Sequence, residues 1–290
     1  NVEVSISPYP RWVLRLFFNL AAKGTVDPVA SPHPILSDVR VRRAIRMAID
    51  VDTISQEIFY GYGAPIWTEL FRPPYACDIP RPKYDPDAAA ALLESAGWID
   101  RDGDGVRECH GCLNAAEGAP MEMELITYSE FGEPMTLSQQ LIAEMLGKIG
   151  LKSQLTVVEG SVLWATAEEG GIEQLENFDV DLWDDGYSGT DPTDFLWELY
   201  SDDAAEPDYG WNIGRWLDDD FNALLDEAYT LDEAVRKDLF CRMAAILDEQ
   251  VPSILMFSVI NAEAHSTRLA GIQSTTFDMV TWNAEDWIVK

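Results

Sequence analysis

Apolar positions alternate with their neighbours in residues 12–18 and 121–128, which predicts two strands, and three further short stretches are also predicted as strands. In the first stretch, Trp12, Leu14, Leu16 and Phe18 occupy every second position. The other stretches predicted as strands are residues 121–128, 151–158, 178–183 and 253–260.

Between these strands, apolar residues recur every three or four positions, which is typical of helices that bury one face. Asp85-Pro86 and Asp191-Pro192 each place a capping aspartate before a proline that suits the first helical turn. The predicted helices cover residues 38–49, 52–61, 86–97, 137–150, 161–169, 192–200, 218–229 and 231–250. This order predicts an α/β fold, a sheet flanked by crossover helices.

The charge of the chain is strongly negative, with 51 Asp and Glu against 20 Lys and Arg and a net charge of −31. Binding to nucleic acid or to an anionic membrane needs clustered basic residues, so the balance argues against both. Residues 151–250 hold 26 acidic and 5 basic side chains. A solvated acidic surface accounts for this density, and the alternative is a field that attracts cationic ligands.

The chain carries few catalytic motifs. Gly186-Tyr187-Ser188-Gly189-Thr190 resembles the turn that holds a nucleophilic serine, but Thr190 stands where the last glycine is required. There are only three histidines and no phosphate-binding loop. Paired carboxylates could still serve a glycosidase-like acidic hydrolase, which is the alternative to a binding function.

The segment Asp100 to Glu108 contains Asp100, Asp102 and Asp104 at alternate positions, followed by glycines. Such carboxylates, together with Glu108, can converge on one calcium ion, because this ion prefers several oxygen ligands. The twelfth position of a complete calcium loop would be a glutamate, but here it is Gly111. A structural calcium site and a simple tight turn are the two interpretations.

Four cysteines occur, at positions 77, 109, 112 and 241. Cys109 and Cys112 are spaced for a local disulfide, and a zinc site that adds Cys77 and His110 is the alternative, as are free thiols. Cys241 falls on the apolar face of a predicted helix, where a small buried hydrophobic residue is expected.

The loop of residues 184–192 runs from the end of a predicted strand to the start of a helix. Ligands of open α/β sheets bind at such carboxyl ends. The candidate ligand-binding residues are therefore those of this loop, with a tyrosine that ends another strand and two residues of a later turn: Asp185, Tyr187, Ser188, Thr190, Tyr128, Trp211 and Asn212. Asp191 is expected to cap the helix rather than to contact a ligand.

Several segments in the right order together resemble one protein family. They are Asp38-Val39-Arg40-Val41-Arg42-Arg43-Ala44-Ile45, Tyr84-Asp85-Pro86, Ala96-Gly97-Trp98, Asp102-Gly103-Asp104-Gly105, Asp191-Pro192, Trp211-Asn212 and Val251-Pro252. This series is similar to that of the family 5 extracellular solute-binding proteins of ABC importers, the peptide- and nickel-binding class.

The resemblance begins in the middle of such proteins. It implies a periplasmic-binding-protein-like lobe of type II (cluster C), with a mixed sheet flanked by helices. Residues 1–258 would form the C-terminal ligand-binding lobe, and residues 259–290 a tail that returns to the N-terminal lobe. Peptide-binding members of the family have an aspartate for the peptide amine three residues before the Asp-Pro aspartate, and here Ser188 takes that position.

The resemblance also implies the function. The chain is expected to bind a peptide, a sugar or a metal complex outside the membrane, in the periplasm or on the outer face of the cytoplasmic membrane, and to deliver it to an ABC transporter permease. No catalysis and no nucleic-acid partner are expected. No cofactor is expected to be required, apart from the calcium ion considered above.

Overall fold

The alternating residues 13–18 form the strand β2 (Val13–Phe18), which lies between two other strands and whose six residues are all buried. The computed structural model describes residues 1–6, 12–187, 189–258, 262–275 and 281–290. Ser188 lies outside these ranges. Within them, β2 runs antiparallel to β8 on one side and to β9 on the other.

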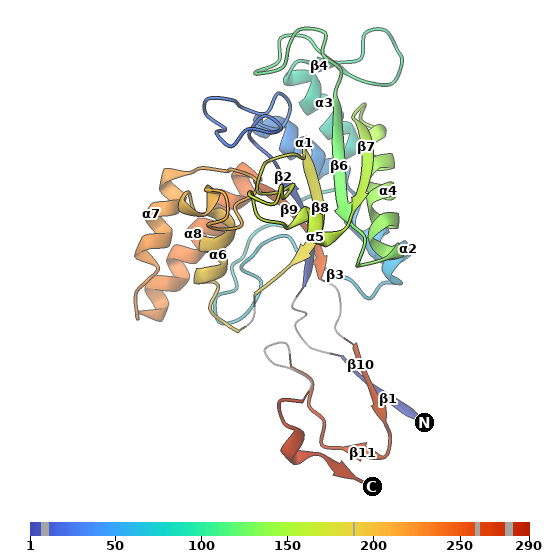
Figure 1. Cartoon of the computed structure of the whole chain (residues 1–290), viewed down its shortest axis with the longest axis vertical. Coiled ribbons are helices and arrows are strands. Elements are labelled where there is room, and N and C mark those ends of the chain that lie inside the picture. Colours follow the sequence, from blue (N-terminus) through green and yellow to red (C-terminus); the bar gives the residue numbers. More distant parts are fainter. Residues whose placement is uncertain (7–11, 188, 259–261, 276–280) are drawn as a thin grey trace.

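The main sheet has six strands in the order β3-β9-β2-β8-β6-β7. β6 runs parallel to both β7 and β8, so the sheet is mixed, as predicted. Besides β2, its strands are β3 (Ala64–Pro65), β6 (Glu122–Tyr128), β7 (Lys152–Val158), β8 (Val180–Asp185) and β9 (Ser253–Ser258). The carboxyl ends of β6, β7, β8 and β9 face the same edge, the lower one in Figure 1.

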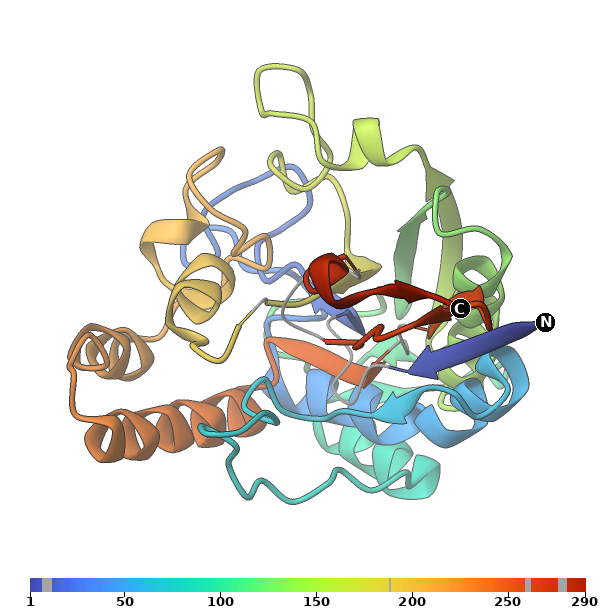
Figure 2. The ribbon, with the colours of Figure 1, turned by 90° about the horizontal axis from the view of Figure 1, so that it is seen from below.

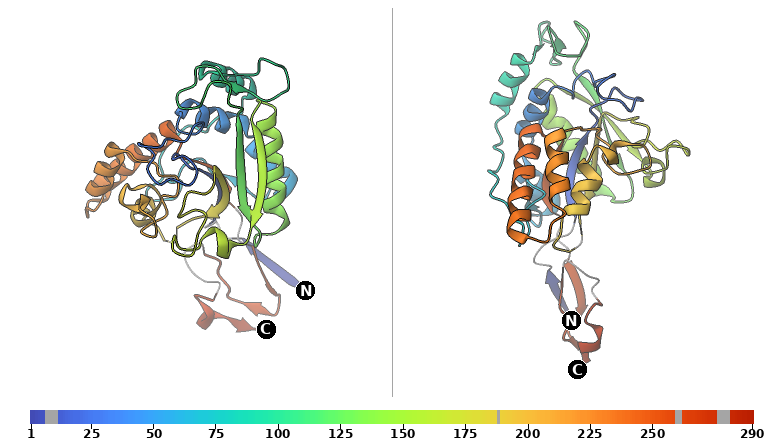
Figure 3. Two further views of the ribbon diagram at one scale, coloured as in Figure 1. Left: turned by 45° about the horizontal axis from the view of Figure 1, so that its top comes forward. Right: turned by 90° about the vertical axis from the view of Figure 1, so that its left-hand side faces the viewer.

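Helices cover the sheet, as Figures 1 and 3 show. α4 packs on β6 and β7, and α7 packs against α8 at the opposite end of the sheet. The helices are α1 (Val39–Ala48), α2 (Val51–Phe59), α3 (Pro86–Ser95), α4 (Glu133–Gly147), α5 (Gly160–Leu163), α6 (Thr193–Tyr200), α7 (Asp219–Glu227) and α8 (Glu233–Gln250). No helix in the described ranges is both long and apolar enough to cross a bilayer.

Arginines of α1 hold this helix against the end of α8. Arg42 donates to the carbonyl oxygens of Gln250 and Val251, and Arg43 donates to that of Glu249. The last carbonyls of a helix lack partners within it and carry partial negative charge, so guanidinium groups satisfy them well. The arginine-rich segment that supports the family resemblance therefore has a structural role, because it attaches α1 to the end of α8.

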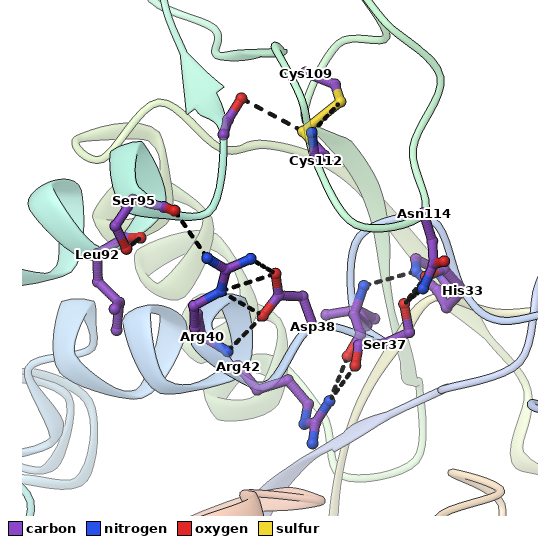
Figure 4. Close-up of polar contacts among 12 residues, drawn as sticks. His33, Ser37, Asp38, Arg40, Arg42, Leu92, Ser95, Cys109, Cys112 and Asn114 are labelled. Carbon is purple, nitrogen blue, oxygen red and sulfur yellow. Dashed lines mark hydrogen bonds and ion pairs between the residues drawn. A yellow bond between two sulfur atoms is a disulfide. The ribbon is translucent and has the colours of Figure 1, made fainter.

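Asp38 caps α1, because its carboxylate accepts a hydrogen bond from the backbone N–H of Arg40. The guanidinium of Arg40 pairs with the same carboxylate at 2.6 Å and donates to the carbonyl of Ser95 at the end of α3 (Figure 4). Asp85 likewise caps α3 through the N–H of Ala88. Local capping and helix–helix packing thus depend on the same side chains.

Two predicted helices differ from the structure. The cap of α2 is Asp50 rather than Asp52, and its carboxylate accepts from the N–H of Thr53. The helix predicted over residues 161–169 ends at Leu163, after one turn. The following residues fold back so closely that a Cβ at Gly171 would lie 1.8 Å from the carbonyl oxygen of Ala165. Tertiary contact therefore overrides helical periodicity here.

Both ends of the chain leave the main body together. β1 (Val2–Ile6) pairs antiparallel with β10 (Ala262–Ser266), and β11 (Leu269–Ala270) pairs with β12 (Ile288–Val289). Figure 1 shows these strands below the edge formed by the carboxyl ends, and Figure 2, seen from below, shows them in front of the main body. The predicted division at residue 258 assigned residues 2–6 to the larger unit, but the structure pairs them with the tail because β1 and β10 complete each other's hydrogen bonds.

Candidate functional site

Two parallel strands bring their carboxyl ends to one place. Thr127 of β6 lies opposite Leu182 of β8, so Tyr128 and the residues 183–185 end at the same edge of the sheet. The hydroxyl of Tyr128 donates a hydrogen bond to the carboxylate of Asp184. Chain segments that are 56 residues apart in sequence are thereby joined at the end that faces the terminal strands.

Aromatic rings extend from this junction in a continuous series. The ring centroids lie 4.8 Å apart for Tyr128 and Trp164, 5.9 Å for Trp164 and Trp183, and 6.4 Å for Trp183 and Trp211. The indole of Trp183 also stacks on Phe17 of β2, at 5.0 Å. The five rings come from five separate segments, so only the tertiary fold assembles this wall.

Tyr128 and the three tryptophans of this series line an open hollow of about 580 Å³, here called the main hollow. Its lining combines the five aromatic side chains Trp12, Tyr128, Trp164, Trp183 and Trp211 with three carboxylates, which are those of Asp184, Asp185 and Glu198. Apolar walls with a few polar groups are the usual composition of a small-molecule site. The main hollow is therefore the candidate ligand site.

Burial changes the titration of the three carboxyl groups. It raises the pKa of Asp185 to about 6, and the charge of Arg15 offsets part of this effect. Burial also raises the pKa of Asp184, despite the hydrogen bond from Tyr128. It raises the pKa of Glu198 as well, and the negative charge of the neighbouring Asp194 raises it further. In such surroundings, ionisation of a carboxyl group is unfavourable in free energy unless a cationic partner lies nearby.

The three other side chains predicted from the 184–192 loop lie elsewhere or are not described. Tyr187 is only 8% exposed, and its ring packs on Phe195 and beneath the guanidinium of Arg72, 4.5 Å away. Thr190 is exposed on the loop and does not line the main hollow. Ser188 falls outside the described residues, so its prediction stays as stated.

Of the later turn, Trp211 lines the main hollow and Asn212 does not. The side-chain amide of Asn212 is buried and donates to the carbonyl oxygens of Ser201 and Trp216, at 3.0 and 2.7 Å. Asn212 therefore shapes the turn that presents Trp211. Asp191 was predicted to cap α6, but Pro192 is the N-cap residue; the carboxylate of Asp191 accepts from the N–H of Thr193 and is paired with Arg236 at 2.6 Å.

Sequence reasoning missed Trp12, Trp164, Trp183 and Glu198 and gave Asp184 only a minor place. Trp183 and Asp184 directly precede the predicted Asp185 at the end of β8, so the strand end itself was the available signal. Trp164 and Glu198 lie on separate helical turns, and no local pattern relates them to β8. Trp164 is held in place by its indole N–H, which donates to Glu173 at 3.1 Å.

The acidic loop of the predicted calcium site does bring its side chains together. One oxygen of each of Asp100, Asp102, Asp104 and Glu108 lies within 4.8 Å of the others. The loop joins β4 (Trp98–Ile99) to β5 (Glu108–Cys109), at the end of the molecule opposite the terminal strands (Figure 1). Its carboxylates also accept from backbone N–H groups, as Asp100 does from Gly103 and Gly105, so a tight turn accounts for part of this geometry.

The cysteines form two pairs. Cys109 is bonded to Cys112, as Figure 4 shows, and Cys77 is bonded to Cys241. The second pair corrects two predictions, because Cys241 is a disulfide partner rather than a lone buried hydrophobic residue, and Cys77 is not available for a zinc site with His110. The 164 residues between Cys77 and Cys241 hide this pairing from sequence reasoning.

Comparisons with known proteins agree with this architecture. The family model "Bacterial extracellular solute-binding proteins, family 5 Middle" matches residues 1–207. Di/tripeptide-binding protein 1 of Pseudomonas aeruginosa is 27% identical over 255 residues, which are 85% of this chain and 40% of that protein. The dipeptide-binding protein of Escherichia coli is 24% identical over 241 residues, 80% of this chain and 38% of that protein.

Solved structures show the same fold. NikZ from Campylobacter jejuni, in complex with Ni(L-His), superposes with a TM-score of 0.80 at 23% identity, over 100% of this chain and 54% of that one. AppA from Bacillus subtilis, in complex with a nonapeptide, gives 0.78 at 18% identity, over 100% and 53%. The chain spans about 40% of the length of the curated relatives. It belongs to the family 5 bacterial extracellular solute-binding proteins.

Proposed function

We propose that this chain is the ligand-binding lobe of the substrate-binding component of an ABC importer. It captures a peptide or another small polar solute outside the membrane, in the periplasm or on the outer face of the cytoplasmic membrane, and presents it to the permease. The observation that carries this proposal is the main hollow, where aromatic rings and three carboxylates meet at the carboxyl ends of β6 and β8. Relatives that bind dipeptides, a nonapeptide and a nickel complex support it.

The terminal strands complete the proposal. β2 begins and β9 ends at the edge beside the main hollow, and the chain beyond each of them leads to β1 and β10. We assign the terminal strands β1, β10, β11 and β12 to the second wall of the ligand cleft. The two walls then close on the ligand by a hinge motion.

The protein binds its ligand and leaves it chemically unchanged. A pair of carboxylates alone does not make a hydrolase, and in the main hollow Asp184 is already engaged by the hydroxyl of Tyr128. None of the relatives reported above is named as a hydrolase, so the alternative has no support. Thr190 and Ser188 remain candidates for contact with a ligand that extends beyond the main hollow.

Tryptophan fluorescence and calorimetry on the 290-residue chain test the proposal. Dipeptides, oligosaccharides and Ni–histidine are added separately, and the recovered ligand is examined for cleavage. One of these classes should bind with a stoichiometry of one and be recovered intact. Asp184→Asn should weaken this binding, whereas Glu227→Gln, an exposed charge removal on α7, should leave it unchanged. Turnover of the ligand, or no binding of any class, overturns the proposal.

A further inference from the structure

A second hollow adjoins the first. It measures about 490 Å³, is here called the side hollow, and shares Trp164, Glu198 and Trp211 with the main hollow. Its further lining includes the aromatic rings of Trp197 and Tyr209. Because both hollows use the same three side chains, one elongated ligand can occupy them together.

All charged side chains that line the two hollows, among the described residues, are carboxylates. They are Asp184 and Asp185 in the main hollow, Glu198 between the two, and Asp194 and Asp208 in the side hollow. None of the five lies within 4.0 Å of a basic nitrogen of the described residues, although sixteen such ion pairs occur elsewhere in those residues. The joined hollow is therefore lined by negative charge that the protein itself does not pair.

A buried cation behind Asp185 offsets this charge only in part. Arg15 lies behind Asp185 and donates to its backbone carbonyl at 3.3 Å, but its guanidinium is paired with Glu69 at 2.5 Å. Arg15 is also completely buried, so it cannot turn toward a ligand. Its pairing leaves the carboxylate of Asp185 facing the hollow with the backbone N–H of Gly186 as its hydrogen-bond donor.

Helix α6 adds like charges at close range. Asp194 and Glu198 are one turn apart on it, and both line the side hollow. Like charges at this spacing destabilise a helix. Burial and Asp194 together raise the pKa of Glu198. A cationic group bound between them would relieve this repulsion, whereas a neutral or anionic ligand would not.

The aromatic lining fits the same ligand class. The faces of Trp and Tyr rings attract ammonium and guanidinium groups, most strongly where water is excluded. Trp164 and Trp211 lie between the two groups of carboxylates and contribute to both hollows. They would therefore flank the aliphatic part of a ligand whose charged ends reach Asp184 and Asp185 on one side and Asp194 and Asp208 on the other.

We propose that the joined hollow binds an elongated ligand with two or more cationic groups separated by an aliphatic chain. This inference rests on the proposed function and names its substrate class. The shared chemistry is a pair of ammonium or guanidinium groups, which can come from a polyamine or from a short peptide rich in Lys or Arg. Spermidine and Lys-Lys are the probes for these two sources.

The test compares spermidine, Lys-Lys, Ala-Ala and Glu-Glu on the 290-residue chain at constant ionic strength, by calorimetry. At least one cationic probe should bind with a stoichiometry of one, at least tenfold more tightly than Ala-Ala, and the tighter of the two identifies the source. Glu198→Gln should weaken the binding of that probe about tenfold and change the affinity for Ala-Ala less than twofold. Glu227→Gln removes the same charge at a position that lines neither hollow and should weaken the binding of neither probe.

The outcomes separate this inference from the proposed function. Binding of Ala-Ala as tight as that of both cationic probes overturns the inference and leaves the proposed function intact. The inference is also overturned if a cationic probe binds with a stoichiometry above one, or if Glu198→Gln and Glu227→Gln weaken its binding equally. Either result shows only attraction to the net charge of −31. The absence of binding of peptides, sugars, nickel complex and spermidine overturns both.

Discussion

The guanidinium of Arg15 and the carboxylate of Glu69 form an ion pair at 2.5 Å in which neither side chain is more than 1% exposed. Glu69 also accepts from the hydroxyl of Tyr200 at 2.6 Å, so the pair is part of a buried network. The network lies directly behind Asp185, whose carbonyl accepts from Arg15. It therefore supports the strand end that forms the main hollow.

Removal of one partner from this network should be strongly destabilising. Glu69→Gln leaves the charge of Arg15 buried without compensation, and the expected loss is about 3–5 kcal/mol in the free energy of unfolding. Urea denaturation measures it. The double variant Arg15→Met with Glu69→Gln should lose less than Arg15→Met alone, because no buried charge remains. A single variant within about 0.5 kcal/mol of the parent would contradict the assigned role.

The two disulfides should differ in their contribution to stability. Cys77 and Cys241 are 164 residues apart, so their bond restricts the unfolded chain much more than that of Cys109 and Cys112, which are 3 residues apart. Replacement of the first pair by serine should cost about 3–5 kcal/mol, and of the second at most about 2 kcal/mol. Chemical denaturation of both double variants checks the order, and equal losses would contradict it.

We predict that the loop of Asp100, Asp102, Asp104 and Glu108 binds calcium. Calcium at about a hundred times its dissociation constant should raise the free energy of unfolding by about 2.7 kcal/mol. Thermal unfolding with and without millimolar calcium measures the gain. Asp102→Asn and Glu108→Gln should each remove most of it, whereas Glu227→Gln should retain it. An equal gain in all three variants would mean general screening of the acidic chain.

A buried pair of carboxyl groups should make stability depend on pH. Burial raises the pKa of Asp181 to about 7, and burial together with Asp181 raises the pKa of Glu173 well above its usual range. The folded protein therefore holds a proton on Asp181 more tightly than the unfolded chain does. The stability that this group contributes is fully present below about pH 4 and is lost as the pH rises through about 7.

Asp181→Asn removes this dependence. At pH 8 the variant should be more stable than the parent by roughly 2–4 kcal/mol, and the difference should shrink toward pH 4. Urea denaturation at several pH values measures both trends. Glu227→Gln serves as the exposed control and should show no such pH-dependent gain. A difference between Asp181→Asn and the parent that stays constant across pH would contradict the shared burial of Asp181 and Glu173.

The order of elements in the main body was predictable because it depends on local patterns. The five predicted strands correspond to β2, β6, β7, β8 and β9, with the last described to Ser258. Capping by Asp38 and Asp85 was predictable for the same reason, since the carboxylate and the N–H that it accepts from lie two or three residues apart. The terminal strands were missed because their pairing is between the two ends of the chain.

The candidate site was only partly predictable. Tyr128, Asp185 and Trp211 were found because they end strands or lie in a turn that the family resemblance marks. Trp164 and Glu198 carry no such signal, since their place beside β8 depends on how α5 and α6 pack. Asn212 and Tyr187 belong to the expected segments, but their side chains are used inside the fold.

By itself, the sequence determined the family, the α/β architecture and the excess of negative charge, because periodicity, caps and composition are properties of neighbouring residues. The tertiary structure alone decided that Cys77 pairs with Cys241 and that Arg15 forms an ion pair with Glu69. It also decided that five carboxylates line adjoining hollows without an ion-pair partner among the described residues. These relationships depend on distances across the fold, and such distances are fixed only when separate segments pack together.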